Sequence, residues 1–250
     1  MKRSFLALSI ALGGIGLAGA RTVPLASDVG APTPREQLSS GAVDRAVEPR
    51  TVTLDDEREG IRQAIRLGES GTYISEILRA RDSALARWPD RHGNPLRVWV
   101  QPASSIDDWH AGFVDQVRSA FVAWDTLRLP VRFKMVADSA DAHIHLTWID
   151  RFKEQISGRT RWARDNDFWI TDASIVLAVH HRTGEVLGDD AMHAMALHEI
   201  GHLLGLDHTQ DQSSVMAPKV RVRQLSNADR ATARLLYSLP AGVIGVSRRG

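Results

Sequence analysis

Five residues late in the chain have the types and spacing of a metal site. His198 and His202 lie four positions apart, with Glu199 directly after the first of them. Positions four apart share one face of a helix, so both imidazoles can reach one metal ion. Gly205 permits a sharp left-handed turn out of such a helix, which brings His208 back as a third ligand. Three protein ligands leave one coordination position open, which is typical of catalytic zinc.

Glu199 has a different expected role. From between the two ligands it reaches the same side of the metal without binding it. There a carboxylate can take a proton from metal-activated water and later deliver it to a leaving amine. An amphipathic helix that carries histidines by chance is the simplest alternative, and the added glycine and third histidine disfavour it. A metal-binding relative without turnover is a second alternative, which the presence of Glu199 disfavours.

The composition limits which other chemistries are open. The 250 residues contain no cysteine, so disulfides, thiolate catalysis and cysteine metal ligands are excluded. A formal net charge of +1 disfavours a nucleic-acid or membrane-surface partner. Hydrophobic residues make up 43% of the chain and charged residues 24%, as in a globular protein with a substantial core.

The first 20 residues resemble an export signal. Lys2 and Arg3 precede an apolar run, and Ala18-Gly19-Ala20 fits the small-x-small pattern of a cleavage site. An uncleaved membrane anchor is the alternative, but the run is short and rich in glycine. We therefore expect a cleaved signal over 1–20, a secreted or periplasmic location, and no stable membrane insertion after cleavage. Residues 21–60, with four prolines and no periodicity, are expected to form a flexible leader.

Elements that would position the site follow this leader. Apolar residues at three- and four-residue steps predict a helical, prosegment-like region from 61, and Pro89 to Pro95 interrupt the pattern within it. We expect this region over 61–95, a catalytic domain over 96–240 and a tail over 241–250. Strands are predicted at 96–100, 131–136, 143–148 and 174–179, with a weaker one at 158–163.

Three helices are expected in the catalytic domain. The first begins at Ser105, with Asp108 at its third position, and keeps one apolar face to Leu127. The second is capped by Asp189 or Asp190 and ends at Gly205, and the third runs from Ser226 to just before Pro240. The order of strands and helices predicts an α+β fold, with a mixed sheet and helices on one side of it.

The motif from His198 to His208 resembles that of the metzincin metallopeptidases, closest to the matrixin branch. The resemblance covers residues 96–239 and includes Met216, which falls on the family's methionine turn beneath the zinc. It implies a twisted, mostly parallel mixed sheet with a long flanking helix, an active-site helix and a C-terminal helix. It also implies that Met216 and Gly205 support the site without binding metal.

Departures from the family pattern limit what the resemblance carries over. Thr209 follows the third histidine where matrixins usually have serine, and no tyrosine follows Met216 as it does in astacin-like relatives. The cysteine switch of matrixin prosegments is impossible here because the chain has no cysteine. We predict one catalytic Zn²⁺ and neither calcium nor a second zinc.

Other histidines and a run of arginines allow two interpretations each. His143 and His145 would share one face of a strand and hold a second metal, or be ordinary polar positions. His180, His181 and His193 are expected to be structural. Arginines around Trp162 would favour acidic substrates at a sheet edge or merely protect that edge from aggregation; they are Arg159, Arg161 and Arg164.

The sequence as a whole predicts a monomeric zinc endopeptidase that hydrolyses extended peptide or protein substrates, with Glu199 as general base and acid. Two other functions stay open. One is an envelope binding protein that keeps the metal but not turnover, and the other is a zinc hydrolase of non-peptide amides. The residues that bind substrate are not identifiable from the sequence.

Overall fold

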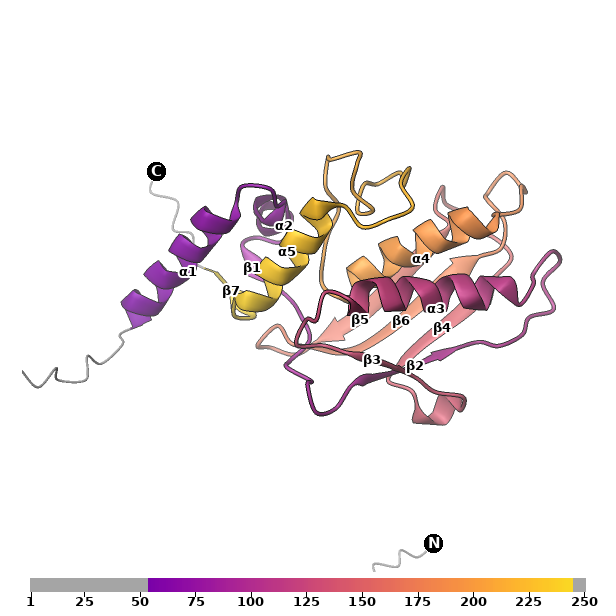
Figure 1. Ribbon diagram of the computed structural model, residues 1–250, viewed down its shortest axis with the longest axis horizontal. Coiled ribbons are helices and arrows are strands. Elements are labelled where there is room, and N and C mark those ends of the chain that lie inside the picture. Colours follow the sequence, from indigo (N-terminus) through magenta and orange to yellow (C-terminus); the bar gives the residue numbers. More distant parts are fainter. Residues whose placement is uncertain (1–53, 245–250) are drawn as a thin grey trace, which may run out of the picture. The chain divides into compact units, whose positions relative to one another are not determined.

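A five-stranded sheet forms the floor of the domain (Figure 1). The computed structural model describes residues 54–244, so the predicted signal over 1–20 and most of the leader lie outside the described residues. The strands run in the order β3-β2-β4-β6-β5. Their bounds are β2 Leu96–Val100, β3 Phe133–Met135, β4 Ile144–Ile149, β5 Gly158–Arg164 and β6 Ile170–Ala178.

The sheet is mostly parallel, as predicted. β2 pairs in parallel with β3 and β4, and β4 pairs in parallel with β6. β5 alone is antiparallel, and it lies at the edge beside β6. Alternation of buried and partly exposed side chains along β2 and β4 places one face of the sheet against the helices. The predicted strand at 174–179 proves longer at its start, because β6 also pairs with β5.

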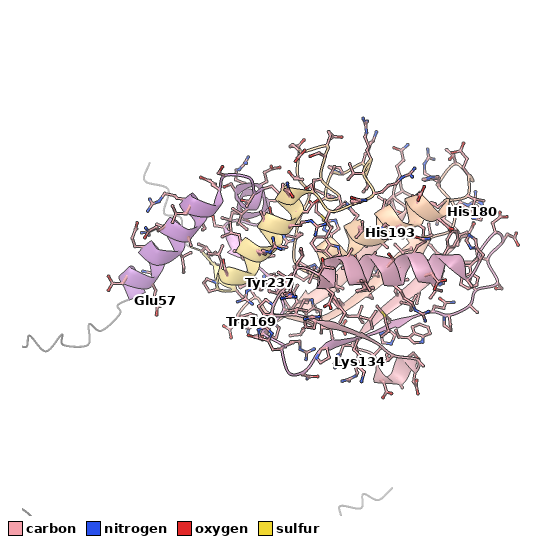
Figure 2. All side chains as sticks on the ribbon, in the orientation of Figure 1. Glu57, Lys134, Trp169, His180, His193 and Tyr237 are labelled. Atoms are coloured by element: carbon pink, nitrogen blue, oxygen red, sulfur yellow. The ribbon has the colours of Figure 1, made fainter. Side chains whose placement is uncertain are left out.

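Two helices cover the same face of the sheet: α3, Gly112–Asp125, and α4, Asp189–Leu203 (Figure 1). They pack side by side, and Trp124 of α3 donates from Nε1 to the carbonyl of Leu197 in α4 at 2.9 Å. His193 also links the helices, since its Nδ1 lies 3.1 Å from the carbonyl of Gln116 (Figure 2). α4 is therefore held in place along most of its length.

The first predicted helix begins later than expected. α3 starts at Gly112, and the predicted cap at Ser105 is wrong. Asp108 has a φ of +62°, a left-handed conformation that a right-handed helix cannot contain. Its carboxylate lies 3.1 Å from Nε2 of His180. This contact holds Asp108 outside the helix, whereas the predicted capping role would have placed it in the first turn.

The segment before the sheet forms two helices and a short strand. They are α1, Leu54–Gly68, α2, Ile74–Ala80, and β1, Ala84–Leu85. The start of α1 makes residues 54–60 helical, whereas the leader was expected to be flexible as far as 60. The predicted helical pattern also ends early, because Asp82 and Ser83 have positive φ and Trp88 lies beyond β1. Trp88 is nevertheless buried, as its spacing suggested.

The last helix, α5, spans Asn227–Ser238 and has the predicted start. Ser226 and Asp229 form a capping box, each bonding the backbone of the other. The short strand β7, Gly242–Val243, then pairs antiparallel with β1. Among residues 54–244, no helix has the length and apolar character needed to cross a membrane.

Candidate metal centre and cleft

The second half of α4 carries the first two predicted ligands. His198 and His202 project from the same face of the helix one turn apart, and their Nε2 atoms lie 3.1 Å from each other. Gly188 precedes α4, and Asp189 and Asp190 in the first turn complement the positive end of the helix. The closeness of the two nitrogens follows from the four-residue spacing.

A tight turn after α4 brings in the third histidine. Gly205 has a φ of +96°, and a Cβ atom there would lie 2.2 Å from the carbonyl oxygen of Ala86. Both facts require glycine at this position. The chain then reverses, and Nε2 of His208 lies 3.3 Å from Nε2 of His198 and from Nε2 of His202.

The three nitrogens fit a tetrahedral zinc ion. Zn–N bonds of about 2.0–2.1 Å in tetrahedral geometry place ligand atoms about 3.3–3.4 Å apart. The observed separations are 3.1, 3.3 and 3.3 Å. In the part of the chain that the structure describes, these histidines are the one group of three or more side chains suited to hold a metal.

The surroundings keep the ligand nitrogens available. Nδ1 of His198 lies 2.6 Å from the carbonyl of Val215, and Nδ1 of His202 lies 3.1 Å from that of Leu206. Each ring therefore carries its proton on Nδ1 and presents a lone pair on Nε2. Burial lowers the pKa of His198 to about 4 and that of His202 to about 3, so both rings are neutral near pH 7.

Glu199 is buried between α4 and the edge strand β5. A Cβ atom at Gly158 would lie 2.4 Å from Oε1 of Glu199, so only glycine leaves room for the carboxylate. Oγ1 of Thr160 lies 2.6 Å from Oε2 and 2.9 Å from the backbone oxygen of Glu199. Burial raises the pKa of Glu199 to about 7, against a smaller lowering by the bonds from Thr160.

Met216 lies against the helix that carries the ligands. It is fully buried, and a Cβ atom at Gly201 would lie 2.3 Å from its sulfur. Gly201 thus lets Met216 pack closely beneath the histidines. Asp229 fixes the turn that carries Met216. Its carboxylate accepts hydrogen bonds from the hydroxyl of Ser214 and, at 3.1 Å, from the backbone N–H of Val215.

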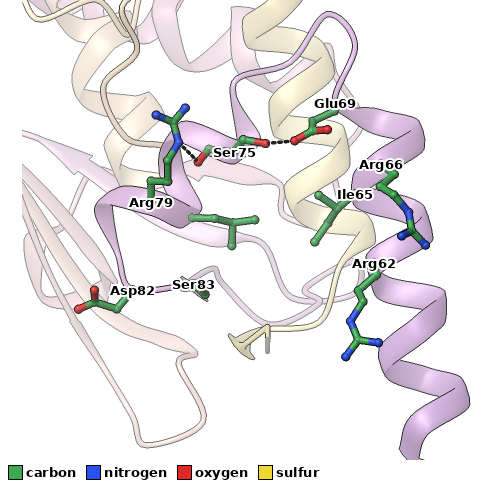
Figure 3. A pocket seen from close by; sticks show the side chains of 9 residues that line it. Arg62, Ile65, Arg66, Glu69, Ser75, Arg79, Asp82 and Ser83 are labelled. Carbon is green, nitrogen blue, oxygen red and sulfur yellow. Dashed lines mark hydrogen bonds between the residues drawn. The ribbon is translucent and has the colours of Figure 1, made fainter. Parts of the chain in front are cut away.

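A cleft of about 410 Å³ opens over the three histidines and Glu199. Residues 155–160 line the cleft, and so do Pro218, Lys219 and Val220. β5 is the last strand of the sheet, so its outer edge is free of strand pairing within the described residues. A larger cavity, of about 910 Å³, lies between α1 and α2 and holds none of the predicted site residues (Figure 3).

Several site features were missed by sequence reasoning. Thr160 and Gly158 were not singled out, although strand alternation places both on the face of β5 that meets α4. Gly201 was also missed, since a glycine inside a helix gives no sign of what packs on it. Asp229 was not singled out as part of the site.

Several of the other polar residues considered in the sequence have local partners. Nδ1 of His143 accepts from the backbone N–H of Arg97 at 3.0 Å, and Nε2 of His145 lies 3.0 Å from the carbonyl of Ser139. These bonds support the ordinary polar interpretation of both histidines. Arg159 pairs with Glu154 at 2.8 Å, and Arg164 lies 3.7 Å from the ring centroid of Phe168.

Comparison with known families identifies one match. The family model described as Matrixin matches residues 103–238, more than half of the chain. The match includes α3, α4, α5 and every strand of the sheet except β2. The search of curated proteins finds no match.

Proposed function

The chain belongs to the matrixin family of zinc metallopeptidases, and from this premise we propose that it is an endopeptidase acting on extended peptide substrates. The observation that carries the proposal is the convergence of three imidazoles and one buried carboxylate in a single cleft. His198, His202 and His208 would hold the zinc ion. When bound, zinc supplies a Lewis acid that polarises the peptide carbonyl and increases the acidity of water.

The free edge of β5 supports binding of an extended chain. A peptide in the cleft would add as a strand beside β5, with its backbone hydrogen-bonded to the edge. The segment at 218–220 would bound it on the other side. An open cleft with two walls accommodates the interior of a polypeptide, which supports endopeptidase action.

Glu199 would act as the general base and then as the general acid. Its pKa of about 7 in the metal-free protein lies near neutrality, where a carboxyl group exchanges protons most effectively. A bound cation favours the ionised form, which is the form needed to accept a proton. Thr160 would hold the carboxylate in position, since its hydroxyl reaches Oε2 from the neighbouring strand.

The location and processing of the chain are part of the same proposal. A cleaved signal over 1–20 would deliver the enzyme to the periplasm or the medium, where protein substrates are accessible. The enzyme would act there as a monomer with one catalytic zinc ion.

Cleavage of a peptide library by the purified, signal-free chain tests the function. We expect internal cuts in the presence of zinc, no cuts after a chelator is added, and recovery when zinc is restored. Glu199→Gln, prepared in the same way, is the matched control for contaminating peptidases. Stoichiometric zinc without cleavage of any peptide would contradict the proposal and favour a binding protein or a hydrolase of non-peptide amides.

A further inference from the structure

The loop that carries His208 has little structure of its own. Residues 206–209 belong to no helix or strand, and they follow a helix whose last carbonyls have no partner within the helix. A metal ligand in such a loop needs contacts from elsewhere to fix its position. Those contacts come from residues 73–88, here called the brace, which precede the sheet and lie outside the matched residues 103–238.

Arg81 of the brace binds the loop at three points. Its Nε donates to Oδ2 of Asp207 at 2.9 Å, and its terminal nitrogens donate to the carbonyls of Gly205 at 3.2 Å and Leu206 at 3.3 Å. The guanidinium and the carboxylate are only 19% and 27% exposed, so solvent screens the pair less than at the surface. A planar group with five donors suits this arrangement, and a lysine could not reproduce it.

These bonds reach two of the three ligands through one intervening residue each. The carbonyl of Leu206 that accepts from Arg81 also lies 3.1 Å from Nδ1 of His202. The carboxylate of Asp207 accepts from the backbone N–H of His208 at 2.8 Å through its other oxygen. Arg81 is therefore placed to orient both histidines without touching either.

Glu76 fastens the other end of the loop. Its carboxylate accepts from Oγ1 of Thr209 at 3.0 Å and from the backbone N–H of Gln210 at 2.9 Å. Thr209 is almost fully buried, so its hydroxyl needs a partner, and Glu76 supplies it. The two brace residues thus hold the chain immediately before and immediately after His208.

The remainder of the brace follows the end of α4. Trp88 donates from Nε1 to the carbonyl of Leu203 at 2.8 Å, and the carbonyl of Ala86 occupies the space beside Gly205. Trp88 therefore satisfies a carbonyl at the end of α4, and Arg81 satisfies two carbonyls of the turn that follows the helix. The residues that line the cleft all lie at position 155 or later, so the brace supports the site without covering it.

We propose that residues 73–88 are a permanent part of the metal site, with Arg81 and Glu76 as positioning residues for His202 and His208. The proposal rests on zinc binding by the three histidines. It revises the expected prosegment-like region over 61–95: if the chain is trimmed on maturation, the cut falls before Tyr73. Removal of residues 73–88 as an inhibitory segment would take away the donors that Arg81 and Trp88 provide to Asp207 and to the carbonyl of Leu203.

Zinc affinity of full-length variants tests this role. Arg81→Gln and Glu76→Gln are compared with Arg79→Gln. Arg79 lies in α2, two residues before Arg81, lines the cavity of Figure 3 and donates from Nε to the carbonyl of Ser75. Competition with a chromogenic chelator measures the zinc dissociation constant. We expect it to rise roughly 10–100-fold for Arg81→Gln, as for other residues that orient ligands, and to stay unchanged for Arg79→Gln.

Two further readouts separate positioning from general stability. The absorption spectrum of the cobalt-substituted protein reports ligand geometry, and it should change in Arg81→Gln but not in Arg79→Gln. Arg81→Lys, which keeps the charge next to Asp207 but cannot span the carbonyls, should have intermediate affinity, and it serves as the test if Arg81→Gln does not fold. Wild-type affinity and spectrum in the Arg81 variant that folds would overturn the proposal.

The outcome also distinguishes the brace from the proposed function. A wild-type chain that binds zinc and cleaves no peptide would contradict endopeptidase action, while weaker zinc binding by Arg81→Gln would still establish the brace. Cleavage by the wild type together with unchanged zinc binding in both brace variants would support the proposed function and contradict the role proposed for the brace.

Discussion

Two histidine environments lie near opposite ends of α4, and they differ in the groups that face the rings. His198 and His202, near the end of the helix, have their Nδ1 atoms against backbone carbonyls. His180, beside the start of the helix, lies between two carboxylates, with Asp108 at 3.1 Å and Asp150 at 2.7 Å (Figure 2). All three side chains are largely withdrawn from solvent, so burial alone does not decide their charge.

The comparison shows how partners set the role of a buried imidazole. Burial without an anion lowers the pKa of His198 to about 4 and leaves a neutral ring with a free lone pair. The hydrogen bond to Asp108, followed by the close carboxylate of Asp150, raises the pKa of His180 despite burial. Both ring nitrogens of His180 lie within 3.1 Å of a carboxylate oxygen, so neither is directed at the metal centre.

The largest expected effect is on turnover, and it comes from changing Glu199, with Asp150 beside His180 as the matched control. Glu199→Gln should lower turnover roughly 10²–10⁴-fold, because an amide cannot accept the proton that a general base removes. Asp150→Asn makes the same chemical change beside His180 and should leave turnover near the wild-type value. Peptide cleavage rates at saturating substrate, with zinc content measured in parallel, check both. An unchanged rate in Glu199→Gln would remove Glu199 from the mechanism.

The second largest expected effect is on zinc binding. His208→Ala should weaken zinc binding by more than the roughly 10–100-fold cost of losing a residue that only orients a ligand. His180→Ala should bind zinc as the wild type does, since its ring has no contact with the triad. Chelator competition followed by metal analysis measures both. Full zinc occupancy in His208→Ala would exclude a third ligand at that position.

The stability of the metal-free protein should fall when the pH is lowered from 7 to 5. The pKa values of His198 and His202, about 4 and 3, lie below the unfolded value, so their contribution is present above pH 6.5 and is lost as the pH falls. Keeping each ring neutral lowers the free energy of unfolding by about 2 kcal/mol at pH 5. Glu199 has the opposite sign, because its pKa is raised to about 7, and it offsets about 2 kcal/mol of this loss.

Chemical denaturation with a chelator present measures this dependence. The net loss expected for the wild type is about 2 kcal/mol, and Glu199→Gln should lose about 4 kcal/mol because the offset is gone. Equal stability of the metal-free variant at pH 7 and pH 5 would show that these histidines are not held neutral by burial.

The smallest effect concerns His180. Its pKa is raised in the folded protein, so its contribution is fully present below pH 6.5 and is lost as the pH rises through the folded value. His180→Gln should therefore flatten the decline in stability above pH 6.5, the opposite limb from the triad. The groups facing the ring are Asp108 and Asp150, and Arg151 pairs with Asp150. Denaturation midpoints of wild type and variant from pH 6 to 9 test the difference, and parallel curves would contradict it.

The sequence predicted those features that depend on local spacing. The α+β metzincin-type fold and membership of the matrixin family are confirmed, because strand alternation and the histidine motif are both local patterns. The start of α5 at Ser226 was predicted for the same reason. The structure also brings together the three ring nitrogens that were placed on one metal from their spacing.

Features that depend on distant segments were not predictable. Thr160 contacts Glu199 only because β5 lies beside α4, and nothing in the residues around Thr160 indicates that neighbour. The helix start at Ser105 was wrong because the contact between Asp108 and His180 overrides a good capping pattern. Arg81 and Glu76 gave no signal at all, since charged residues in or beside a short helix are usually solvated.

The brace also has a consequence for the order in which the protein is made. The brace leaves the ribosome early, yet Arg81 meets Asp207 across a separation of 126 residues. β1 can pair only later still, because its partner strand β7 lies after the last helix. Until then, the apolar side chains of Ile74, Ile77, Leu85 and Trp88 have no complete core to enter. The segment that completes the metal site is thus translated before the residues it contacts, and its apolar side chains stay exposed until those residues have been made.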